Sequence, residues 1–313
     1  MTTYNINIKN LNVKFATRFS GIEVIENINV DFAFGQITGI VGESGSGKSV
    51  LGMSILKLLP STATVTGTCM YGGKDLYKLD RKEIKKIKCK DIGLIAQNPI
   101  QALNPVLTIG KQLKEPLIKH LKMSGKEAYG ICIKHLKEFG FDNANEIMKK
   151  YSFQLSGGMN QRIISIMGLI CKPNWIIADE PTKGLDSILR KSVYEVLLNI
   201  KEHYTKSMII ITHDLYFAKK ICDNIVVMHK GEIVEAGKIQ DVFNSPKHPY
   251  TKGLINATPQ NGMIPIPEGI NKKEKSGCKF YDRCTSSNIK CVTDRIDMKR
   301  LNDGRLVRCK LYD

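Results

Sequence analysis

A glycine-rich segment at residues 42–49 constrains the fold of this chain more than any other feature. It reads Gly-Glu-Ser-Gly-Ser-Gly-Lys-Ser and fits the pattern in which main-chain N–H groups surround phosphate oxygens. An apolar run at 37–41 precedes it, and an apolar helical segment at 50–59 follows it and ends near Pro60. Strand, phosphate loop and helix in this order open an α/β nucleotide-binding core. The pattern predicts nucleotide contacts from Gly42, Ser44, Gly45, Ser46, Gly47, Lys48 and Ser49, with Ser49 also holding Mg²⁺.

A second apolar strand, predicted over 175–178, runs into two acidic residues, Asp179 and Glu180. Beside a phosphate loop, Asp179 fits a partner of Mg²⁺. Glu180 fits a general base that polarises the attacking water. The alternative to these roles is that Asp179 and Glu180 are simply two exposed acidic residues at the end of a strand.

The rest of the chain falls into recognisable blocks. Residues 4–34 alternate apolar and polar side chains, which predicts an antiparallel layer with one wet face. From 98 to 158 the period becomes helical, so we expect a helical subdomain inserted in the core. Strand and helix patterns then alternate from 175 to 222. We therefore predict one nucleotide-binding domain over 1–258 and a small extension over 259–313, which begins at Pro259, Pro265 and Pro267.

The formal net charge of +17 allows a nucleic-acid partner or a basic solvated surface. The basic stretch at 74–90 has the period of a surface helix, with Ile84 and Ile87 on its apolar side, and lacks interleaved aromatic residues. We expect no nucleic-acid partner. The longest apolar runs, such as 163–170, are too short to span a bilayer, and the first residues do not resemble a secretory signal. We therefore expect a cytoplasmic location.

Residues 155–159 narrow the class of phosphate-loop protein. Leu155, Ser156, Gly157, Gly158 and Met159 precede Asn-Gln-Arg, and here the chain resembles the ABC ATPase superfamily. The resemblance implies a RecA-like core with an antiparallel β layer and a helical subdomain. It also implies that this turn acts on ATP bound to a second, similar subunit. A helix N-terminus suits such a role because its N–H groups point at the phosphate.

The same resemblance assigns further residues. Gln97 is similar to the family's Q-loop glutamine, which touches Mg²⁺ and the water, and His213 resembles the histidine that contacts the γ-phosphate. Asp186 occupies the D-loop, although Lys-Gly replaces the family's usual Ser-Ala at 183–184. Phe15, with Phe19 as the second choice, is the candidate for stacking on adenine.

Over nearly the whole chain, the resemblance is greatest to ATPases of peptide and nickel importers. The matching stretches include Glu43 in the loop, residues 97–105, His248-Pro249-Tyr250 and the tail. This implies an ATPase that energises import of dipeptides or oligopeptides, with nickel chelates as the alternative cargo. A nucleic-acid-associated ABC ATPase is the remaining alternative. The implied partners are a second ATPase subunit, expected to be a paralogue, two permease subunits and, indirectly, a solute-binding protein. The chain would then sit on the cytoplasmic side of the membrane, attached through the permeases.

Four of the nine cysteines gather in the tail, namely Cys278, Cys284, Cys291 and Cys309. Four thiolates suit a [4Fe–4S] cluster or tetrahedral zinc, and the spacing alone does not choose between these and a metal-free tail. The tail resembles the extension of peptide-importer ATPases, which implies a [4Fe–4S] cluster. The other five cysteines are expected to be small apolar residues of the core.

Overall fold

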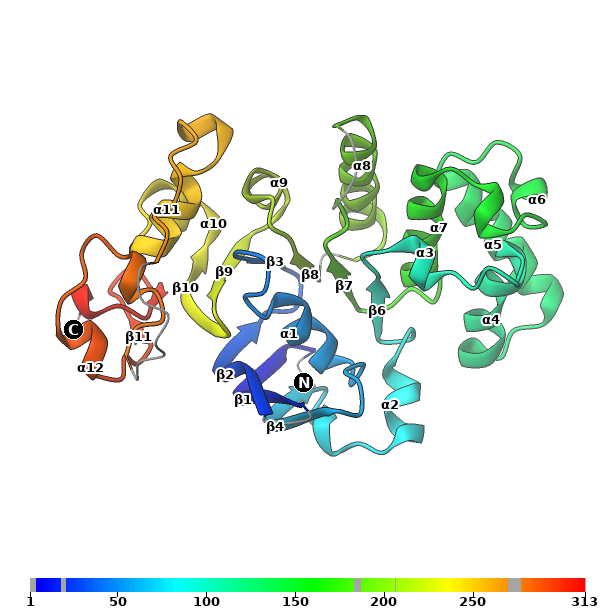
Figure 1. Ribbon diagram of the computed structural model, residues 1–313. Coiled ribbons are helices and arrows are strands. Elements are labelled where there is room, and N and C mark those ends of the chain that lie inside the picture. The colour runs from blue at the N-terminus through cyan, green and yellow to red at the C-terminus, as the bar shows by residue number, and fades with distance from the viewer. Residues whose placement is uncertain (1–3, 18–20, 183–186, 206, 270–276, 313) are drawn as a thin grey trace.

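The central strands of this chain are apolar on both faces, and such strands need covering layers on both sides. In the computed structural model, which describes residues 4–17, 21–182, 187–205, 207–269 and 277–312, an eight-stranded sheet has this arrangement. Its strand order is β11-β12-β10-β9-β3-β8-β7-β6 (Figure 1). The parallel central strands are β3 (Ile37–Val41), β6 (Ile92–Ile95), β7 (Trp175–Asp179), β8 (Met208–Ile211) and β9 (Asn224–His229).

Alternate residues of these strands belong to two separate cores. In β8, Met208 and Ile210 pack with the helices on one face, whereas Ile209 and Ile211 pack with the antiparallel layer on the other. All four side chains are fully buried. The period of two along a strand thus places each core on its own side of the sheet.

The second core lies under a four-stranded antiparallel sheet of order β2-β1-β4-β5. Its strands are β1 (Ile6–Ala16), β2 (Gly21–Phe32), β4 (Ala63–Tyr71) and β5 (Lys74–Asp75). The alternation predicted from residues 4–34 is therefore confirmed. The basic stretch that follows is helical only over α2 (Arg81–Ile87), where Ile84 and Ile87 are buried as predicted, because its first residues form β5 and a short turn.

The predicted helical block forms one end of the molecule, at the right of Figure 1. Ile109, Leu113 and Leu117 are fully buried along one helix, while Ile118 of the same predicted stripe is exposed. The block contains α3 (Pro99–Ala102), α4 (Ile109–Leu121), α5 (Gly125–Glu138) and α6 (Ala144–Ile147), and α7 (Gly157–Leu169) starts at its predicted end and runs beyond it.

The remaining elements lie around and beyond the large sheet. They are α1 (Lys48–Ile55), α8 (Ser187–His203), α9 (Leu215–Ile221), β10 (Glu232–Lys238), α10 (Ile239–Asn244) and α11 (Pro249–Asn256). His248 caps α11 by accepting a hydrogen bond from the Tyr250 N–H, so the predicted turn at 248–250 does start this helix. In the part of the chain that the structure describes, no helix is both long enough and apolar enough to cross a bilayer.

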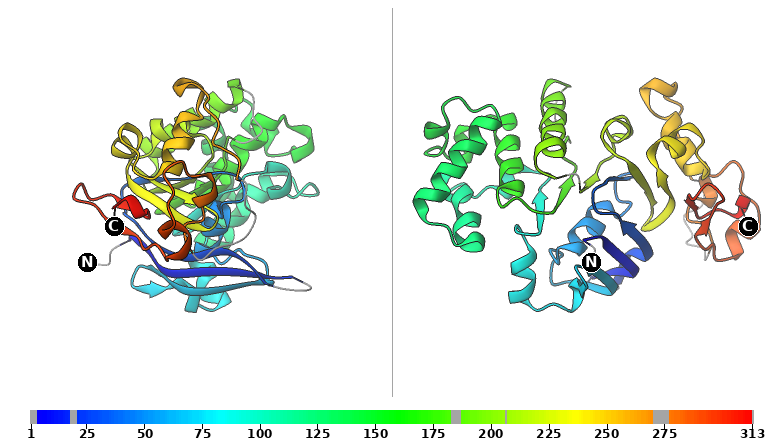
Figure 2. Two further views of the ribbon diagram at one scale, coloured as in Figure 1. Left: turned by 60° about the vertical axis from the view of Figure 1, so that its left-hand side comes forward. Right: turned by 180° about the vertical axis from the view of Figure 1, so that it is seen from behind.

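The C-terminal tail continues the large sheet. β12 (Leu306–Val307) pairs antiparallel with β10, and β11 (Lys299–Arg300) pairs with β12. A short helix, α12 (Lys290–Thr293), precedes them. Figure 1 and the view from behind at the right of Figure 2 show the tail and the helical block at opposite ends of the molecule, and Figure 1 shows α1 between them. The sequence predicted an extension from residue 259, and the structure adds that this segment shares backbone hydrogen bonds with the core.

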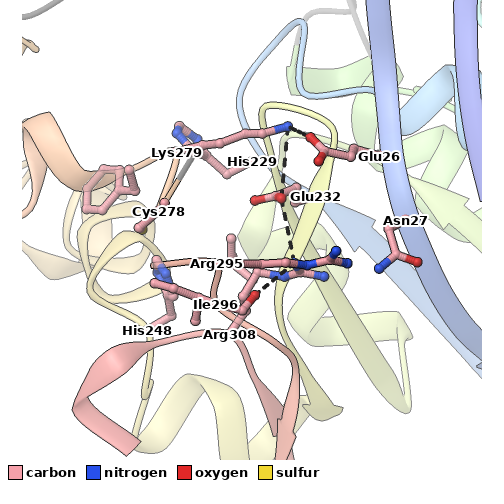
Figure 3. Close-up of a pocket in the computed structure, with 13 residues that line it drawn as sticks. Glu26, Asn27, His229, Glu232, His248, Cys278, Lys279, Arg295, Ile296 and Arg308 are labelled. Carbon is pink, nitrogen blue, oxygen red and sulfur yellow. Dashed lines mark hydrogen bonds and ion pairs between the residues drawn. The ribbon is translucent and has the colours of Figure 1, made fainter. Parts of the chain in front are cut away.

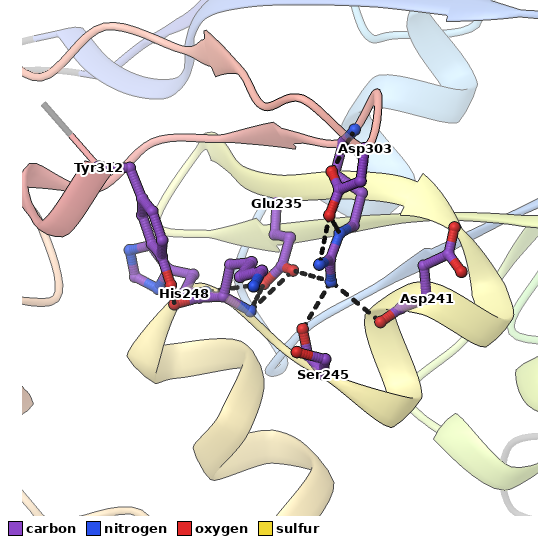
Figure 4. Close-up of polar contacts among 8 residues, drawn as sticks. Glu235, Asp241, Ser245, His248, Asp303 and Tyr312 are labelled. Carbon is purple, nitrogen blue, oxygen red and sulfur yellow. Dashed lines mark hydrogen bonds and ion pairs between the residues drawn. The ribbon is translucent and has the colours of Figure 1, made fainter.

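A buried ion pair holds the tail against β10 (Figure 4). Glu235 is fully buried, and its carboxylate accepts hydrogen bonds from the main-chain N–H groups of Lys247 and His248. Arg305 of the tail is 4% exposed and lies 3.8 Å from this carboxylate. Arg305 also donates to the Asp241 carbonyl oxygen at 2.9 Å. Burial raises the pKa of Glu235, and the two main-chain N–H groups and Arg305 oppose that shift.

We expect Arg305→Met to destabilise the fold strongly. Methionine keeps the aliphatic stem that packs against Gly237, but it leaves Glu235 as a buried carboxylate without its cation. Losing one partner of a buried pair costs about 3–5 kcal/mol. Chemical unfolding measures this change. The matched control is Arg300→Met, which removes an exposed arginine of the same tail. Equal stabilities of the two variants would contradict the role of Arg305.

The junction of core and tail also contains two buried histidines. Burial lowers the pKa of His248 to about 3 and that of His229 to about 4. In the unfolded chain both rings bind a proton near pH 6.5, so the unfolded state takes up more protons as pH falls. The two neutral rings therefore make their full contribution to the free energy of unfolding above about pH 6.5. That contribution decreases as the pH falls toward the pKa values of the folded state.

We predict that His248→Asn reduces this pH dependence by about half, or by about 1.4 kcal/mol per pH unit between pH 6 and pH 4. Asparagine retains an acceptor for the first turn of α11, so the slope changes more than the fold. Unfolding free energies at several pH values provide the test. His203→Asn, at an exposed position on α8, should keep the wild-type slope. An unchanged slope in His248→Asn would refute the prediction.

Candidate nucleotide-binding site

The phosphate loop (residues 42–49) lies between the end of β3 and the start of α1, as the sequence predicted. A Cβ on Gly42 would lie 2.1 Å from the Met228 carbonyl oxygen, so only glycine fits there. Gly47, with φ +96°, caps α1. The Ser46 hydroxyl is buried and has no protein partner among the described residues. This narrow main-chain loop, with an unsatisfied hydroxyl and a helix N-terminus, suits a bound phosphate group.

Lys48 is buried at the first position of α1. Its ammonium group donates to the carbonyl oxygens of Gly42 at 2.9 Å and Glu43 at 2.8 Å. A buried cation needs such acceptors. An ionised phosphate oxygen is a stronger acceptor than a carbonyl oxygen, so an incoming triphosphate would compete well for this ammonium group.

The acidic residues lie at the adjacent strand end. The Ser49 hydroxyl donates to the Asp179 carboxylate at 2.8 Å, which joins the loop to the last residue of β7. Glu180 has a left-handed backbone, with φ +47°, and its N–H donates to the Ile211 carbonyl oxygen. This backbone turn directs the chain away from the sheet directly after the strand. A serine and two carboxylates are thus grouped where a hard divalent cation would find oxygen ligands.

His213 follows β8 and reaches the same place. Its Nδ1 donates to the Glu180 carboxylate at 2.6 Å. The Glu180 side chain is 8% exposed, whereas that of His213 is 51% exposed, so the imidazole covers the carboxylate from the solvent side. The two residues are 33 positions apart in the chain, and only the parallel pairing of β7 with β8 brings them together.

The remaining predicted site residues have fewer contacts with this group of side chains. Gln97 comes two residues after β6, at the same edge of the sheet as Asp179, and is half-buried. Phe15 lies near the end of β1, packs partly against the second core and pairs with Ile22 and Ala63. Among the described residues, no hydrogen bond or aromatic contact joins Phe15 to the phosphate loop. Phe19, the second choice, lies outside the described residues, as do Asp186 and the Lys-Gly pair before it.

The turn at 155–159 opens α7. Leu155 is buried and Ser156 caps the helix, accepting from the Met159 N–H at 3.3 Å. Ser156 and Gly157 are exposed, Gly158 is half-buried, and open space surrounds the position of a Cβ on Gly157. A helix N-terminus that faces solvent leaves its N–H groups available to another molecule.

Two contacts at the site have no local signal in the sequence. Gln161 on α7 donates to the Pro181 carbonyl oxygen at 3.1 Å. This bond connects the helix that begins at the 155–159 turn to the residue after Glu180. Glu43 in the loop pairs with Arg283 of the tail. Glu43 and Gln161 lie within sequence motifs, but their partners lie 240 and 20 positions away in the chain, so only the tertiary fold sets the pairing.

The four tail cysteines converge on one pocket. Cys278, Cys284, Cys291 and Cys309 all line it, together with His248 and Ile296. Burial raises the pKa of Cys278 to about 12, and the other three thiols add to the shift. Within the described ranges, however, no group of three or more histidine, cysteine or acidic side chains is arranged closely enough to hold a single metal ion.

Comparisons with known proteins agree with this geometry. A family model described as ABC transporter matches residues 25–183, and one described as Oligopeptide/dipeptide transporter, C-terminal region, matches 234–291. The dipeptide transport ATP-binding protein DppD of Bacillus subtilis is 38% identical, over 98% of this chain and 95% of its own length. The oligopeptide transport ATP-binding protein OppD of Escherichia coli is 34% identical, over 97% of this chain and 92% of its own length.

Solved structures show the same fold. A dimeric post-hydrolysis state of the ATP-binding cassette MJ0796, bound to ADP and phosphate, matches with a TM-score of 0.67 and 28% identity, covering 75% of this chain and 98% of that one. A second match is cbiO1 from Clostridium perfringens, part of the transporter complex cbiONQ, with a TM-score of 0.64 and 26% identity, covering 78% of this chain and 92% of that one. With its phosphate loop, its paired acids and these relatives, the chain belongs to the family of ABC transporter ATP-binding proteins.

Proposed function

We propose that this chain binds and hydrolyses ATP to energise the import of dipeptides or oligopeptides. The main observation in support is a pair of hydrogen bonds beside the phosphate loop, one from Ser49 to Asp179 and one from His213 to Glu180. Phosphoryl transfer to water needs a loop for the phosphates, oxygen ligands for Mg²⁺ and a group that orients the water. This site contains side chains for all three tasks.

Each of these residues has one role in the proposed hydrolysis of ATP. Lys48 and the main-chain N–H groups from Gly42 to Ser49 bind the β- and γ-phosphates, and Ser49 and Asp179 hold Mg²⁺. When bound, Mg²⁺ neutralises charge that develops on the transferred phosphate. Glu180 accepts the proton of the attacking water, and His213 keeps the Glu180 carboxylate in place and faces the γ-phosphate. Gln97 approaches the same point from β6.

ATP would be shared between two such subunits. Ser156, Gly157 and Gly158 form a helix N-terminus open to solvent, and these N–H groups suit a phosphate bound to another molecule. The related cassette MJ0796 forms a dimer with ADP and phosphate bound, which supports this arrangement. We expect the second subunit to be a paralogue and Leu155 to Met159 of each chain to act on the partner's nucleotide.

The names of the relatives support peptides as the cargo. DppD and OppD are described as transport ATP-binding proteins for dipeptides and oligopeptides, and the match at 234–291 is to the C-terminal region of that type. In this proposal two permease subunits contact the chain on the cytoplasmic side of the membrane. A solute-binding protein delivers the peptide from the other side.

We predict that Glu180→Gln lowers ATP turnover by about 10²–10⁴, because a positioned general base supplies a factor of that size. Binding of Mg-ATP should remain close to wild type, since glutamine keeps the shape and a hydrogen bond to His213. Steady-state phosphate release and nucleotide binding, measured on the chain with its partner subunit, test both parts. Glu202→Gln, an exposed change on α8, is the matched control.

The same variants test the cargo in cells. Glu180→Gln should abolish uptake of a labelled dipeptide, and Glu202→Gln should preserve it. Full turnover in Glu180→Gln would refute the catalytic assignment. Normal peptide uptake together with lost nickel uptake would replace peptide by nickel as the cargo.

We further propose that the four tail cysteines bind a [4Fe–4S] cluster. Their convergence on one pocket supports this. A [4Fe–4S] cluster is held by four cysteine thiolates, and four cysteines line this pocket. When bound, it would cross-link the tail through thiolates at four positions of the chain.

We expect the protein, when purified without oxygen, to be brown, to absorb at about 400 nm and to contain about four iron atoms per chain. Cys284→Ser should lose most of this iron, and Cys89→Ser, a half-buried thiol outside the tail, should keep it. Colourless protein with one zinc per chain, or with no metal, would overturn the cluster.

A further inference from the structure

The tail contacts the phosphate loop directly through one ion pair. Arg283 donates to both carboxylate oxygens of Glu43, at 2.9 and 2.7 Å. This bidentate geometry is the strongest that arginine forms with a carboxylate. The residues are 240 positions apart in the chain, and their side chains are 18% and 37% exposed. We refer to this contact as the loop–tail ion pair.

Glu43 is held at its main chain as well as its side chain. Its N–H donates to the Tyr250 hydroxyl at 2.9 Å, and its carbonyl oxygen accepts from Lys48 at 2.8 Å. Hydrogen bonding from Arg283 lowers the pKa of the Glu43 carboxyl, and burial opposes that shift. Glu43 is thus ionised at neutral pH and fixed from three directions, between Gly42 and Ser44 of the loop.

Arg283 is itself held rigidly. Its Nε donates to the Pro267 carbonyl oxygen at 2.9 Å, and its guanidinium lies 5.6 Å from the centre of the Phe280 ring. Phe280 is buried against Tyr250, at 5.3 Å, and against His229, at 5.4 Å. The arginine therefore approaches the loop from a packed aromatic cluster.

A second cation fastens the same segment to the antiparallel layer (Figure 3). Lys279 donates to the Glu26 carboxylate at 2.7 Å and to the Lys230 carbonyl oxygen at 3.1 Å. Figure 3 shows Lys279 extending toward Glu26 past Glu232. Together with Arg283, Lys279 thus attaches residues 278–284 to β2, to the turn between β9 and β10 and to the phosphate loop.

We propose that Arg283 is a positioning residue for nucleotide binding, which keeps the phosphate loop in its binding shape through Glu43. The loop contains glycines at 42, 45 and 47, and glycine loses more backbone freedom on ordering than any other residue. A contact that orders the loop in advance removes that loss from the binding step. The inference rests on the proposed ATPase function, because it concerns the same loop.

Three variants of the full chain test the proposal: Arg283→Met, Glu43→Gln and the double variant. We expect each single change to raise the Kd for Mg-ATP about three- to tenfold. A loop that adopts the binding shape a third to a tenth of the time weakens binding by that factor. The double variant should bind no worse than either single variant, because both remove the same contact. Arg295→Met, which breaks an exposed arginine–aspartate pair in the tail, is the control and should bind normally.

Thermal unfolding without nucleotide separates positioning from simple loss of the fold, since Glu43→Gln leaves the tail intact and should unfold near the wild-type temperature. Wild-type Kd values in Arg283→Met and Glu43→Gln, or effects that add in the double variant, would overturn the loop–tail ion pair as a positioning contact while leaving the ATPase function in place. Failure of the wild-type chain to bind Mg-ATP would overturn both proposals.

Discussion

The close approach of two backbones, at Gly42 and Met228, is the constraint on which the rest of the site depends. With a Cβ only 2.1 Å from a carbonyl oxygen, no other residue fits where β3 ends. Next to it, the Gly231 N–H donates to the Ser46 carbonyl oxygen at 3.1 Å, so the turn between β9 and β10 also fixes the loop. The shape of the loop therefore depends on a hairpin almost 200 residues further along the chain.

That hairpin also explains why the tail matters to the site. Its second strand, β10, pairs with β12 of the tail, and Glu235 of β10 is neutralised by Arg305. The phosphate loop contacts one end of the hairpin and the tail lies along its outer edge. Core, loop and tail are consequently joined by main-chain hydrogen bonds and by arginine–glutamate contacts, which include Arg305 with Glu235 and Arg283 with Glu43.

The local patterns of the sequence predicted much of this architecture. Alternating residues predicted β1 and β2, because a strand with one buried face shows a period of two, whereas continuous apolar runs predicted the strands β3, β7 and β8, which are buried on both faces. The motifs predicted that Ser49, Asp179, Glu180 and His213 would act together, and the structure brings them into two hydrogen-bonded pairs. Their assigned roles in catalysis remain predictions.

Other features had no local signal. The sequence analysis predicted neither the β9–β10 hairpin nor β12, and the pairing of β9 with β3 and of β12 with β10 depends on contacts between distant parts of the chain. Arg283 and Arg305 lie in the tail near its cysteines, and nothing beside them in the sequence indicated Glu43 or Glu235 as a partner. Whether such a residue is solvated or meets a carboxylate depends on tertiary packing, and the sequence does not specify which glutamate faces it.

The bond from Gln161 to the Pro181 carbonyl oxygen has a consequence for cooperation between two cassettes. It ties the helix that would serve the neighbour's nucleotide to the strand end that would cleave the chain's own. Any displacement of α7 by the neighbour's ligand is thus transmitted to the backbone beside Glu180. Because binding linkage is reciprocal, each nucleotide would alter the affinity for the other by the same factor. In the proposed dimer, one amide side chain would thereby couple the occupancy of one nucleotide site to that of the other.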